Sequence, residues 1–129
     1  MKVLLVDDEE NFRQIITSAF EKEGINIVVG KNGREGLDKA KQEKPDLILL
    51  DQMLTDITGN DVLTQLKADY LTKDIPVMMV SNFGHEALVK QAMEKGAVDY
   101  IYKYSVETQD VINKVRDILK TNTPPAKQD

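Results

Sequence analysis

Apolar and polar positions alternate in two rhythms along the chain. Short apolar runs begin near Val3, Asn26, Leu47, Val77 and Asp99, and each leads into a longer segment where apolar residues recur every three or four positions. Runs of the first kind are typical of strands, and the second spacing is typical of helices with one apolar face. The pattern therefore predicts five βα units, which form a parallel sheet with helices between the strands.

The ends of the predicted helices are marked as well. Gly24 and Gly96 follow two apolar stripes and Pro45 follows a third; glycine often ends a helix and proline cannot continue one. The five stripes run from Phe12 to Phe20, Leu37 to Ala40, Val62 to Leu66, Leu88 to Met93 and Val111 to Leu119. Because the apolar pattern then stops, we expect a folded domain over residues 1–120 and a flexible tail or linker stub over residues 121–129.

Two of the predicted strands, Leu47 to Leu50 and Val77 to Val80, are apolar at every position. Continuous apolar strands are expected in the middle of a parallel sheet, where both faces are covered. Since crossover connections between parallel strands are right-handed, few strand orders remain possible. We expect an α/β fold of the flavodoxin-like, doubly wound kind, with a five-stranded parallel sheet in the order 2-1-3-4-5 and five helices.

Composition narrows the classes of function. Lysine and arginine number 17 against 22 aspartates and glutamates, and the net charge of −5 argues against direct nucleic-acid binding through a basic surface. The lack of cysteine excludes disulfides, thiolate zinc sites and thiol nucleophiles. No apolar run approaches the ~18 residues of a membrane span, and the region after Met1 lacks a secretory signal. We therefore expect a cytoplasmic protein that does not bind membranes.

Charged and hydroxyl side chains follow four of the predicted strands. Asp7 and Asp8 follow the first strand, Asp51 the third, Ser81 the fourth and Lys103 the fifth. Ligands of open parallel sheets bind at the carboxyl ends of the strands, near the point where the strand order reverses. These five side chains are therefore expected to share one pocket.

Three neighbouring carboxylates repel one another unless a cation neutralises them. Mg²⁺ suits such a group, since it takes oxygen ligands from one or two carboxylates together with phosphate oxygens. Taken alone, the acids from Asp7 to Glu10 could equally be a helix N-cap and first turn. Asp51 and Lys103 at the same sheet edge favour a site. The first loop has acids where a nucleotide fold has glycines, so the pocket suits one metal-screened phosphoryl group better than a nucleotide.

The pattern resembles the receiver domain of two-component response regulators, over residues 2 to about 120. The family's marks are an acid pair after the first strand, an aspartate after the third with a glycine eight residues later, a hydroxyl after the fourth and a lysine after the fifth. They match Asp7, Asp8, Asp51, Gly59, Ser81 and Lys103.

The resemblance implies a role for each residue. Asp51 would accept a phosphoryl group from a phosphohistidine of a sensor histidine kinase or phosphotransfer protein. Asp8, Asp51 and the backbone carbonyl of Met53 would bind Mg²⁺, and Asp7 would act through a bound water. Lys103 would pair with a phosphoryl oxygen. The chain would then be a phosphoacceptor signalling domain that promotes its own phosphorylation and dephosphorylation, and not an enzyme acting on a separate substrate.

The resemblance also implies a switch. Ser81 would move to donate to the phosphoryl group, and Tyr100 would turn into the space that Ser81 leaves. This would alter the face made by the fourth helix, fifth strand and fifth helix, where a downstream effector protein or domain, or a second copy of the chain, would bind. The alternative for Tyr100 is an ordinary aromatic residue on an edge strand.

The chain departs from the family at several positions. Thr55 and Tyr104 stand where the family usually has proline, after the phosphoacceptor and after the lysine. The second proline typically follows a cis bond, so the Lys103–Tyr104 bond is expected to be either trans or strained. We expect the loop carrying Lys103 to be placed differently.

Three further positions concern access to the acceptor. Asn82 replaces a small residue and is expected to narrow the approach to Asp51. Met53 and Phe83 flank the line along which water would attack, and both are apolar. We hypothesise that they exclude water and prolong the phosphorylated state; the alternative is that both merely cover the core.

Three other functions compete with this interpretation. A pseudo-receiver would keep the fold and bind proteins without phosphorylation, with Thr55, Asn82 and Tyr104 as signs of drift. An aspartate-nucleophile phosphatase would need an acid at the position of Met53. A flavin carrier is disfavoured by the acidic first loop and the lack of tryptophan.

Overall fold

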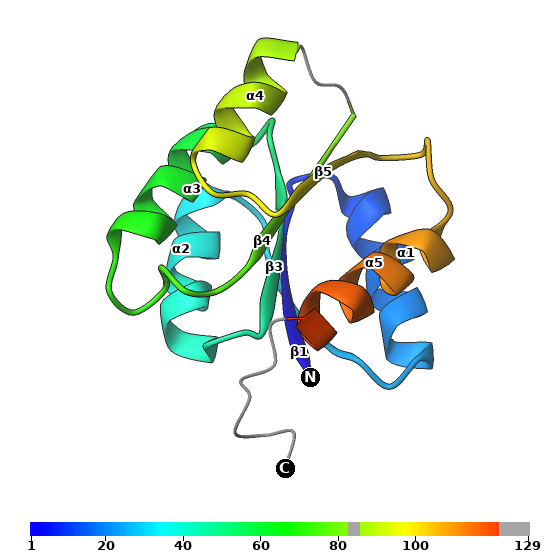
Figure 1. Cartoon of the computed structure of the whole chain (residues 1–129). Coiled ribbons are helices and arrows are strands. Elements are labelled where there is room, and N and C mark those ends of the chain that lie inside the picture. Colours follow the sequence, from blue (N-terminus) through cyan, green and yellow to red (C-terminus); the bar gives the residue numbers. More distant parts are fainter. Residues whose placement is uncertain (83–85, 122–129) are drawn as a thin grey trace.

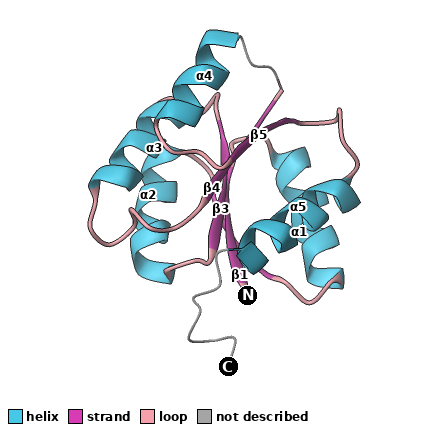
Figure 2. Cartoon of the chain, viewed as in Figure 1, coloured by secondary structure: helices cyan, strands magenta, loops and turns pink. Residues whose placement is uncertain are grey.

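The computed structural model describes residues 1–82 and 86–121, and they form one parallel sheet with helices on both faces (Figures 1 and 2). The strand order is β2-β1-β3-β4-β5, which confirms the predicted flavodoxin-like order. The strands are β1 (Lys2–Val6), β2 (Asn26–Gly30), β3 (Leu47–Asp51), β4 (Val77–Ser81) and β5 (Asp99–Tyr102). Every neighbouring pair is parallel.

Five helices connect and follow the strands, as the apolar periodicity predicts. They are α1 (Glu10–Lys22), α2 (Gly33–Glu43), α3 (Gly59–Ala68), α4 (Glu86–Glu94) and α5 (Thr108–Thr121). Figure 1 shows α1 and α5 on one side of the sheet and α2, α3 and α4 on the other. Within the described residues, no helix is long and apolar enough to cross a bilayer. Helix α5 extends one residue beyond the predicted domain boundary, and residues 122–129 of the predicted tail lie outside the described part of the chain.

The helix ends follow the expected backbone chemistry. Gly24 and Gly96 have φ angles of 75° and 105°, in the left-handed region that favours glycine. Lys44 ends α2 with a φ of 47°, directly before the proline that stops the helix. At the start of α3, the Thr58 side chain accepts a hydrogen bond from the backbone N–H of Asp61.

Two apolar clusters form the core, one on each face of the sheet. The cluster on the α1 and α5 side includes Phe20 and Val115, and the cluster on the other side includes Leu63 from α3. All residues of β3 and β4 are buried, which confirms both as central strands. Burial on both faces therefore fixes the places at which these strands end.

The strand register brings the polar strand ends to one edge. Val6 of β1 lies opposite Leu50 of β3, so the residues that follow β1 lie beside the end of β3. Asp51 lies opposite Val80, so Ser81 lies one position beyond the end of this pairing. The sheet thus gathers side chains that are far apart in sequence.

Gly59 closes the loop that follows β3. Its N–H donates to the carbonyl oxygen of Gln52, with 2.8 Å between nitrogen and oxygen. A Cβ atom at Gly59 would collide with the carbonyl oxygen of Asp51 and would lie 2.7 Å from the Cα atom of Gln52. Both neighbours are backbone atoms, so a side chain at this position requires the loop or the strand end to shift.

We predict that Gly59→Ala destabilises the protein by about 1–3 kcal/mol, the usual cost of forcing an extra carbon into a packed region. Urea unfolding measures this free energy. Gln65→Ala on the exposed face of α3 is the matched control and should change stability little. Alanine ordinarily favours helices over glycine, so a stabilised Gly59→Ala protein would contradict the backbone collision.

Candidate functional site

Three carboxylates meet at the carboxyl edge of the sheet. Asp7 and Asp8 follow β1, and Asp51 is the last residue of β3. Each offers one oxygen atom, and these atoms all lie within 4.8 Å of one another. Asp7 and Asp51 are buried, whereas Asp8 is exposed. The expectation that these acids lie together is confirmed.

Lys103 places a buried ammonium among these acids. Its Nζ lies 2.7 Å from Oδ2 of Asp7 and 3.4 Å from Oδ2 of Asp51. It also donates to Oε1 of Glu9 at 3.3 Å. Burial alone would lower the pKa of Lys103, but the hydrogen bonds and charges of the acids outweigh burial and raise it. The ammonium is therefore held in its charged form.

The single ammonium does not neutralise the acids completely. Burial, and after it the charge of Asp7, raise the pKa of Asp51 to about 7 in spite of the opposing effect of Lys103. Burial is also the main cause of the raised pKa of Asp7. The negative charges of the acids outnumber the single positive charge of Lys103. A hard divalent cation such as Mg²⁺, which prefers oxygen ligands, would compensate this excess. The acidic cluster can thus hold a metal ion.

The contacts at the start of α1 show whether the acids there serve only as helix caps or form part of a site. Glu9 is the N-cap residue, and α1 has no side-chain cap. Oδ1 of Asp7 accepts the N–H of Glu9 at 2.8 Å, which forms a turn before the helix, and Arg13 donates to the backbone carbonyl of Asp7 at 2.9 Å. The interpretation of these acids as helix caps alone is therefore wrong for Asp7, whose carboxylate faces Lys103.

The peptide bond between Lys103 and Tyr104 is trans, since none of the described residues has a cis bond. Tyr104 has a φ of 63°, in the left-handed region that non-glycine residues rarely adopt. Its ring packs edge-on against Phe12, with 5.9 Å between ring centres. The N–H of Lys103 donates to the carbonyl of Ser81 at 2.7 Å, so the lysine continues the strand pairing and reaches the acids without the family's proline.

Ser81 and Tyr100 lie near the acids, on β4 and β5. Ser81 is fully buried, and its Oγ accepts or donates no hydrogen bond among the described residues. Tyr100 is half-buried, packs against the cluster on the α3 and α4 side, and lies near Ser81 and Gln52. Burial is the main cause of its raised pKa. Whether these residues form a switch stays a prediction.

The residues predicted to control water access are placed in part. Met53 is 51% exposed, in the loop after β3. Its N–H approaches Oδ1 of Asp51 at 3.4 Å. Asn82 is exposed, and Phe83 lies outside the described residues. An exposed Met53 covers little of the core, and its role in water access stays a prediction.

Sequence analysis missed several residues that surround the site. The Phe12 ring lies 4.7 Å from Nζ of Lys103, a cation–π contact, and Glu9 completes the acid partners of the lysine. Gln52 and Asn60 form a buried pair. Nε2 of Gln52 donates to Oδ1 of Asn60 at 3.0 Å, and the backbone N–H of Asn60 donates to Oε1 of Gln52 at 2.8 Å. A polar residue directly after Asp51, Gln52, was the available signal.

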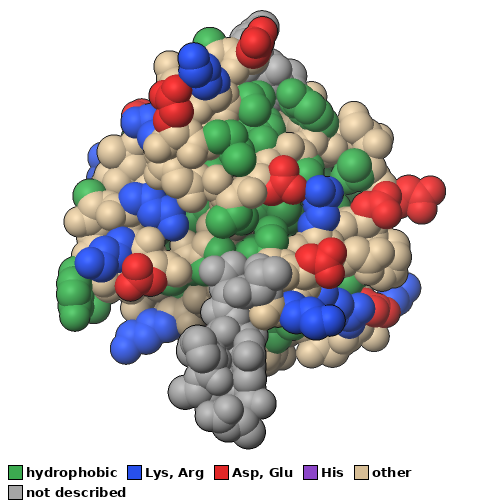
Figure 3. Space-filling model, in the orientation of Figure 1, with side chains coloured by type: hydrophobic (Ala, Val, Ile, Leu, Met, Phe, Trp, Pro, Cys, Tyr) green, Lys and Arg blue, Asp and Glu red, His purple; other side chains and the backbone are tan. Residues whose placement is uncertain are grey.

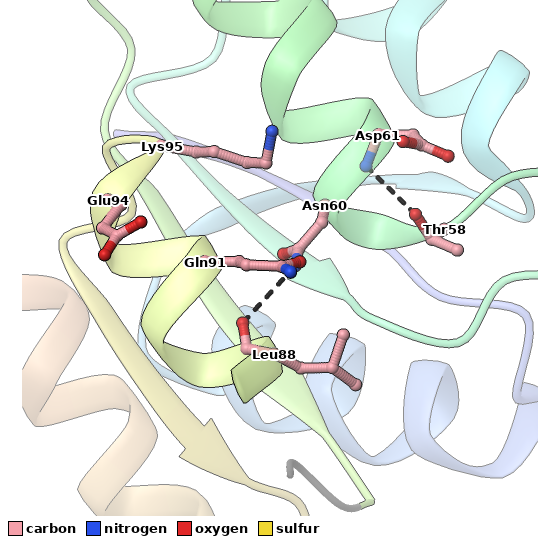
Figure 4. A pocket seen from close by; sticks show the side chains of 7 residues that line it. All are labelled: Thr58, Asn60, Asp61, Leu88, Gln91, Glu94 and Lys95. Carbon is pink, nitrogen blue, oxygen red and sulfur yellow. Dashed lines mark hydrogen bonds between the residues drawn. The ribbon is translucent and has the colours of Figure 1, made fainter. Parts of the chain in front are cut away.

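Asn60 connects this pair to α4. Its Nδ2 donates at 3.4 Å to the carbonyl of Leu88 and to Oε1 of Gln91 (Figure 4). A groove opens between α3 and α4, lined by Thr58, Asn60, Asp61, Leu88, Gln91, Glu94 and Lys95. Ala92 is the only buried residue of α4, and the contacts of Asn60 add polar interactions to this helix.

Comparison with known proteins places this geometry in a family. The response regulator receiver domain family matches residues 3–116. The phosphate regulon transcriptional regulatory protein PhoB of Pseudomonas aeruginosa is 35% identical over 122 residues, covering 95% of this chain and 53% of PhoB. Sporulation initiation phosphotransferase F of Bacillus subtilis is 29% identical, covering 95% of this chain and 94% of that protein.

Solved structures agree with the sequence relatives. A CheY-like receiver domain protein from Methanospirillum hungatei superimposes with a TM-score of 0.87 at 26% identity, covering 93% of this chain and 94% of that one. The chain spans about half the length of the PhoB regulators it matches. With the acids, the hydroxyl and the lysine gathered at the carboxyl edge of a 2-1-3-4-5 sheet, the chain belongs to the response regulator receiver domain family, whose members accept phosphoryl groups in two-component signalling.

Proposed function

We propose that Asp51 is the residue of this receiver domain that accepts the phosphoryl group. The observation that supports this most strongly is the meeting of Asp7, Asp8 and Asp51 within 4.8 Å, with the ammonium of Lys103 at 3.4 Å from Asp51. The same observation disfavours the pseudo-receiver, since the charged groups that the chemistry would need are present and lie close together. The donor would be a phosphohistidine of a sensor histidine kinase or a phosphotransfer protein.

The proposed reaction joins one carboxylate oxygen of Asp51 to phosphorus. The bond between phosphorus and the donor's imidazole nitrogen breaks, and the imidazole leaves with the electron pair. Asp51 must be ionised to attack, and Lys103 pairs with a phosphoryl oxygen as negative charge gathers. The domain would in this way promote its own phosphorylation, and by attack of water its own dephosphorylation.

Mg²⁺ would be held by Asp8, Asp51 and the backbone carbonyl of Met53, with Asp7 acting through a water molecule. When bound, the ion would neutralise the carboxylates and the incoming phosphoryl oxygens. The carboxylate oxygens of Asp7, Asp8 and Asp51, which lie within 4.8 Å of one another, support the carboxylate part of this assignment.

The output would pass through Ser81 and Tyr100 to the face of α4, β5 and α5. The buried Oγ of Ser81 has no hydrogen-bond partner in the described chain and could donate to a phosphoryl oxygen after a small movement. Hydrophobic side chains gather on the face over α4 and β5 (Figure 3), where Met93, Val98 and Tyr102 are exposed. An effector protein or domain, or a second copy of the chain, would cover this face in the cytoplasm.

The phosphoacceptor role predicts a specific covalent product. Incubation with Mg²⁺ and acetyl phosphate should add one alkali-labile phosphoryl group to the wild-type protein, measured as intact mass. Asp51→Asn, which lacks the nucleophilic oxygen, should gain none. Wild-type protein that gains no mass would contradict the proposal, and continuous release of phosphate without a phosphorylated protein would indicate a phosphatase.

Protons and a metal ion would compete for the carboxylate of Asp51. In EDTA, which removes divalent ions, the thermal stability of the protein should therefore depend on pH. The pKa of Asp51 is about 7 in the folded protein against an ordinary 3.8. Between these values the folded state keeps a proton that the unfolded state has lost, so wild-type stability falls as pH rises. Asp51→Asn removes this penalty and should raise the melting temperature by roughly 5 °C at pH 8, with little gain at about pH 4.

Asp56→Asn is the matched control for this prediction. Burial opposes the shift, but backbone N–H groups of Arg34, Gly33 and Ile57 outweigh burial and lower the pKa of Asp56. Its ionised form therefore stabilises the fold at high pH, and the substitution should lower the melting temperature there. An Asp51→Asn gain that is equal at both pH values would contradict the raised pKa of Asp51.

The exposed Met53 side chain predicts a long-lived phosphoryl form. Met53→Asn replaces an apolar side chain with one that can bind the attacking water, so the phosphoryl lifetime should fall about tenfold, equivalent to ~1.4 kcal/mol of barrier. Loss of mass over time after removal of the donor measures the lifetime. Tyr70→Asn, at an exposed apolar residue after α3, is the control. Equal lifetimes in wild type and Met53→Asn would exclude the role of Met53.

A further inference from the structure

Asp56 ties the loop after β3 to the start of α2. Its Oδ1 accepts the N–H of Gly33 at 2.8 Å, and its Oδ2 accepts the N–H of Arg34 at 3.0 Å. Its Oδ1 also accepts the N–H of Ile57 at 2.9 Å, which holds the carboxylate against its own loop. The first N–H groups of a helix have no partner inside the helix, so this carboxylate meets strong, aligned donors.

A second contact presses the same loop onto α2. The Ile57 side chain lies over Gly33 so closely that a Cβ atom at Gly33 would collide with it. Asn32 caps α2 independently, through the N–H of Glu35 at 2.9 Å. Since α2 has its own cap, the bonds from Asp56 are not needed to start the helix. They fix the position of the loop.

The opposite end of the loop is anchored in a different way. The carbonyl of Gln52 accepts the N–H of Gly59 at 2.8 Å, and the Gln52 side chain pairs with Asn60. Met53 lies between these anchors, three residues before Asp56. The stretch from Met53 to Thr55 makes few bonds of its own, the approach of the Met53 N–H to Asp51 at 3.4 Å being one.

Thr55 makes this stretch depend on its anchors. A proline at this position would fix the backbone angle φ near −65°, whereas threonine can adopt a wider range of φ. Among the described residues, Thr55 makes no hydrogen bond that could restrain the backbone as the ring of a proline would. A loop without this internal restraint must be ordered by contacts at its ends.

We propose that Asp56 is a positioning residue for the metal site: it fixes the loop that carries Met53, so that the backbone carbonyl of Met53 can serve as a metal ligand beside the carboxylate cluster. This inference rests on the proposed function, in which that carbonyl is a Mg²⁺ ligand. Asp56 contacts neither the metal nor the phosphoryl group. It acts through the backbone that it pins to α2, as supporting residues around metal ligands do.

The test measures Mg²⁺ affinity by isothermal titration calorimetry, without any phosphodonor. Asp56→Ala removes both anchoring oxygens and should weaken Mg²⁺ binding about 10-fold, the lower end of the usual loss for supporting residues. Asp56→Asn keeps one acceptor oxygen and should lose less. Asp61→Ala removes the same charge from an exposed position in the first turn of α3 and should bind Mg²⁺ as the wild type does.

Rescue separates positioning from general damage. In the Asp56→Ala protein, Thr55→Pro restores an internal restraint and should recover most of the lost affinity. A thermal melt confirms that each variant is folded; if Asp56→Ala is not, Asp56→Asn with and without Thr55→Pro carries the same comparison. Equal Mg²⁺ affinity in wild type and the folded Asp56 variants would overturn the inference. So would a loss of affinity in Asp61→Ala as large as that in Asp56→Ala, because removal of one negative charge would then explain both. Wild-type protein that binds no Mg²⁺ would overturn the proposed function itself.

Discussion

The structure depends on a buried ammonium among carboxylates that it cannot fully neutralise. Lys103 lies 2.7 Å from Asp7 and 3.4 Å from Asp51, in a site from which water is largely removed. Removing charges from water is costly unless they are paired, and here one cation faces several anions. A divalent ion at these carboxylates would relieve the repulsion among them. The folding free energy of the apolar core is what maintains this arrangement of charges.

The sheet supplies the geometry that makes this site possible. Strands buried on both faces cannot slide without exposing apolar residues or burying polar ones, so β3 must end at Asp51 and β4 at Ser81. The site consequently rests on two fully buried strands. Helix α4 differs, because Ala92 is its only buried residue, and Asn60 of α3 adds two hydrogen bonds of 3.4 Å to it. Gln52, the residue after Asp51, pairs with Asn60 and so connects the end of β3 to α4.

The fold and the principal acids were predictable because both follow from local pattern. Each strand is a compact apolar run, and the polar residue that ends it is adjacent in sequence, as with Asp51 after Leu50. Glu9, Phe12 and Asp56 were not assigned, since their roles come from contacts across 94, 91 and 23 positions of the chain. Tyr104 shows a different limit: its left-handed backbone replaces the expected proline geometry, and no residue pattern indicates that conformation.

Two groups of the site, the Asp51 carboxylate and the Ser81 hydroxyl, would both gain interactions on phosphorylation. Asp51 resists ionisation, and the Ser81 hydroxyl is buried without a partner in the described chain. A phosphoryl group bound with a metal ion would satisfy both, because the metal compensates the charge on Asp51 and a phosphoryl oxygen accepts the serine proton. A phosphorylated state would thus gain interactions at these two residues. A ligand shifts a conformational equilibrium only through a difference in its interactions with the two states, and Asp51 and Ser81 are the residues at which that difference would arise.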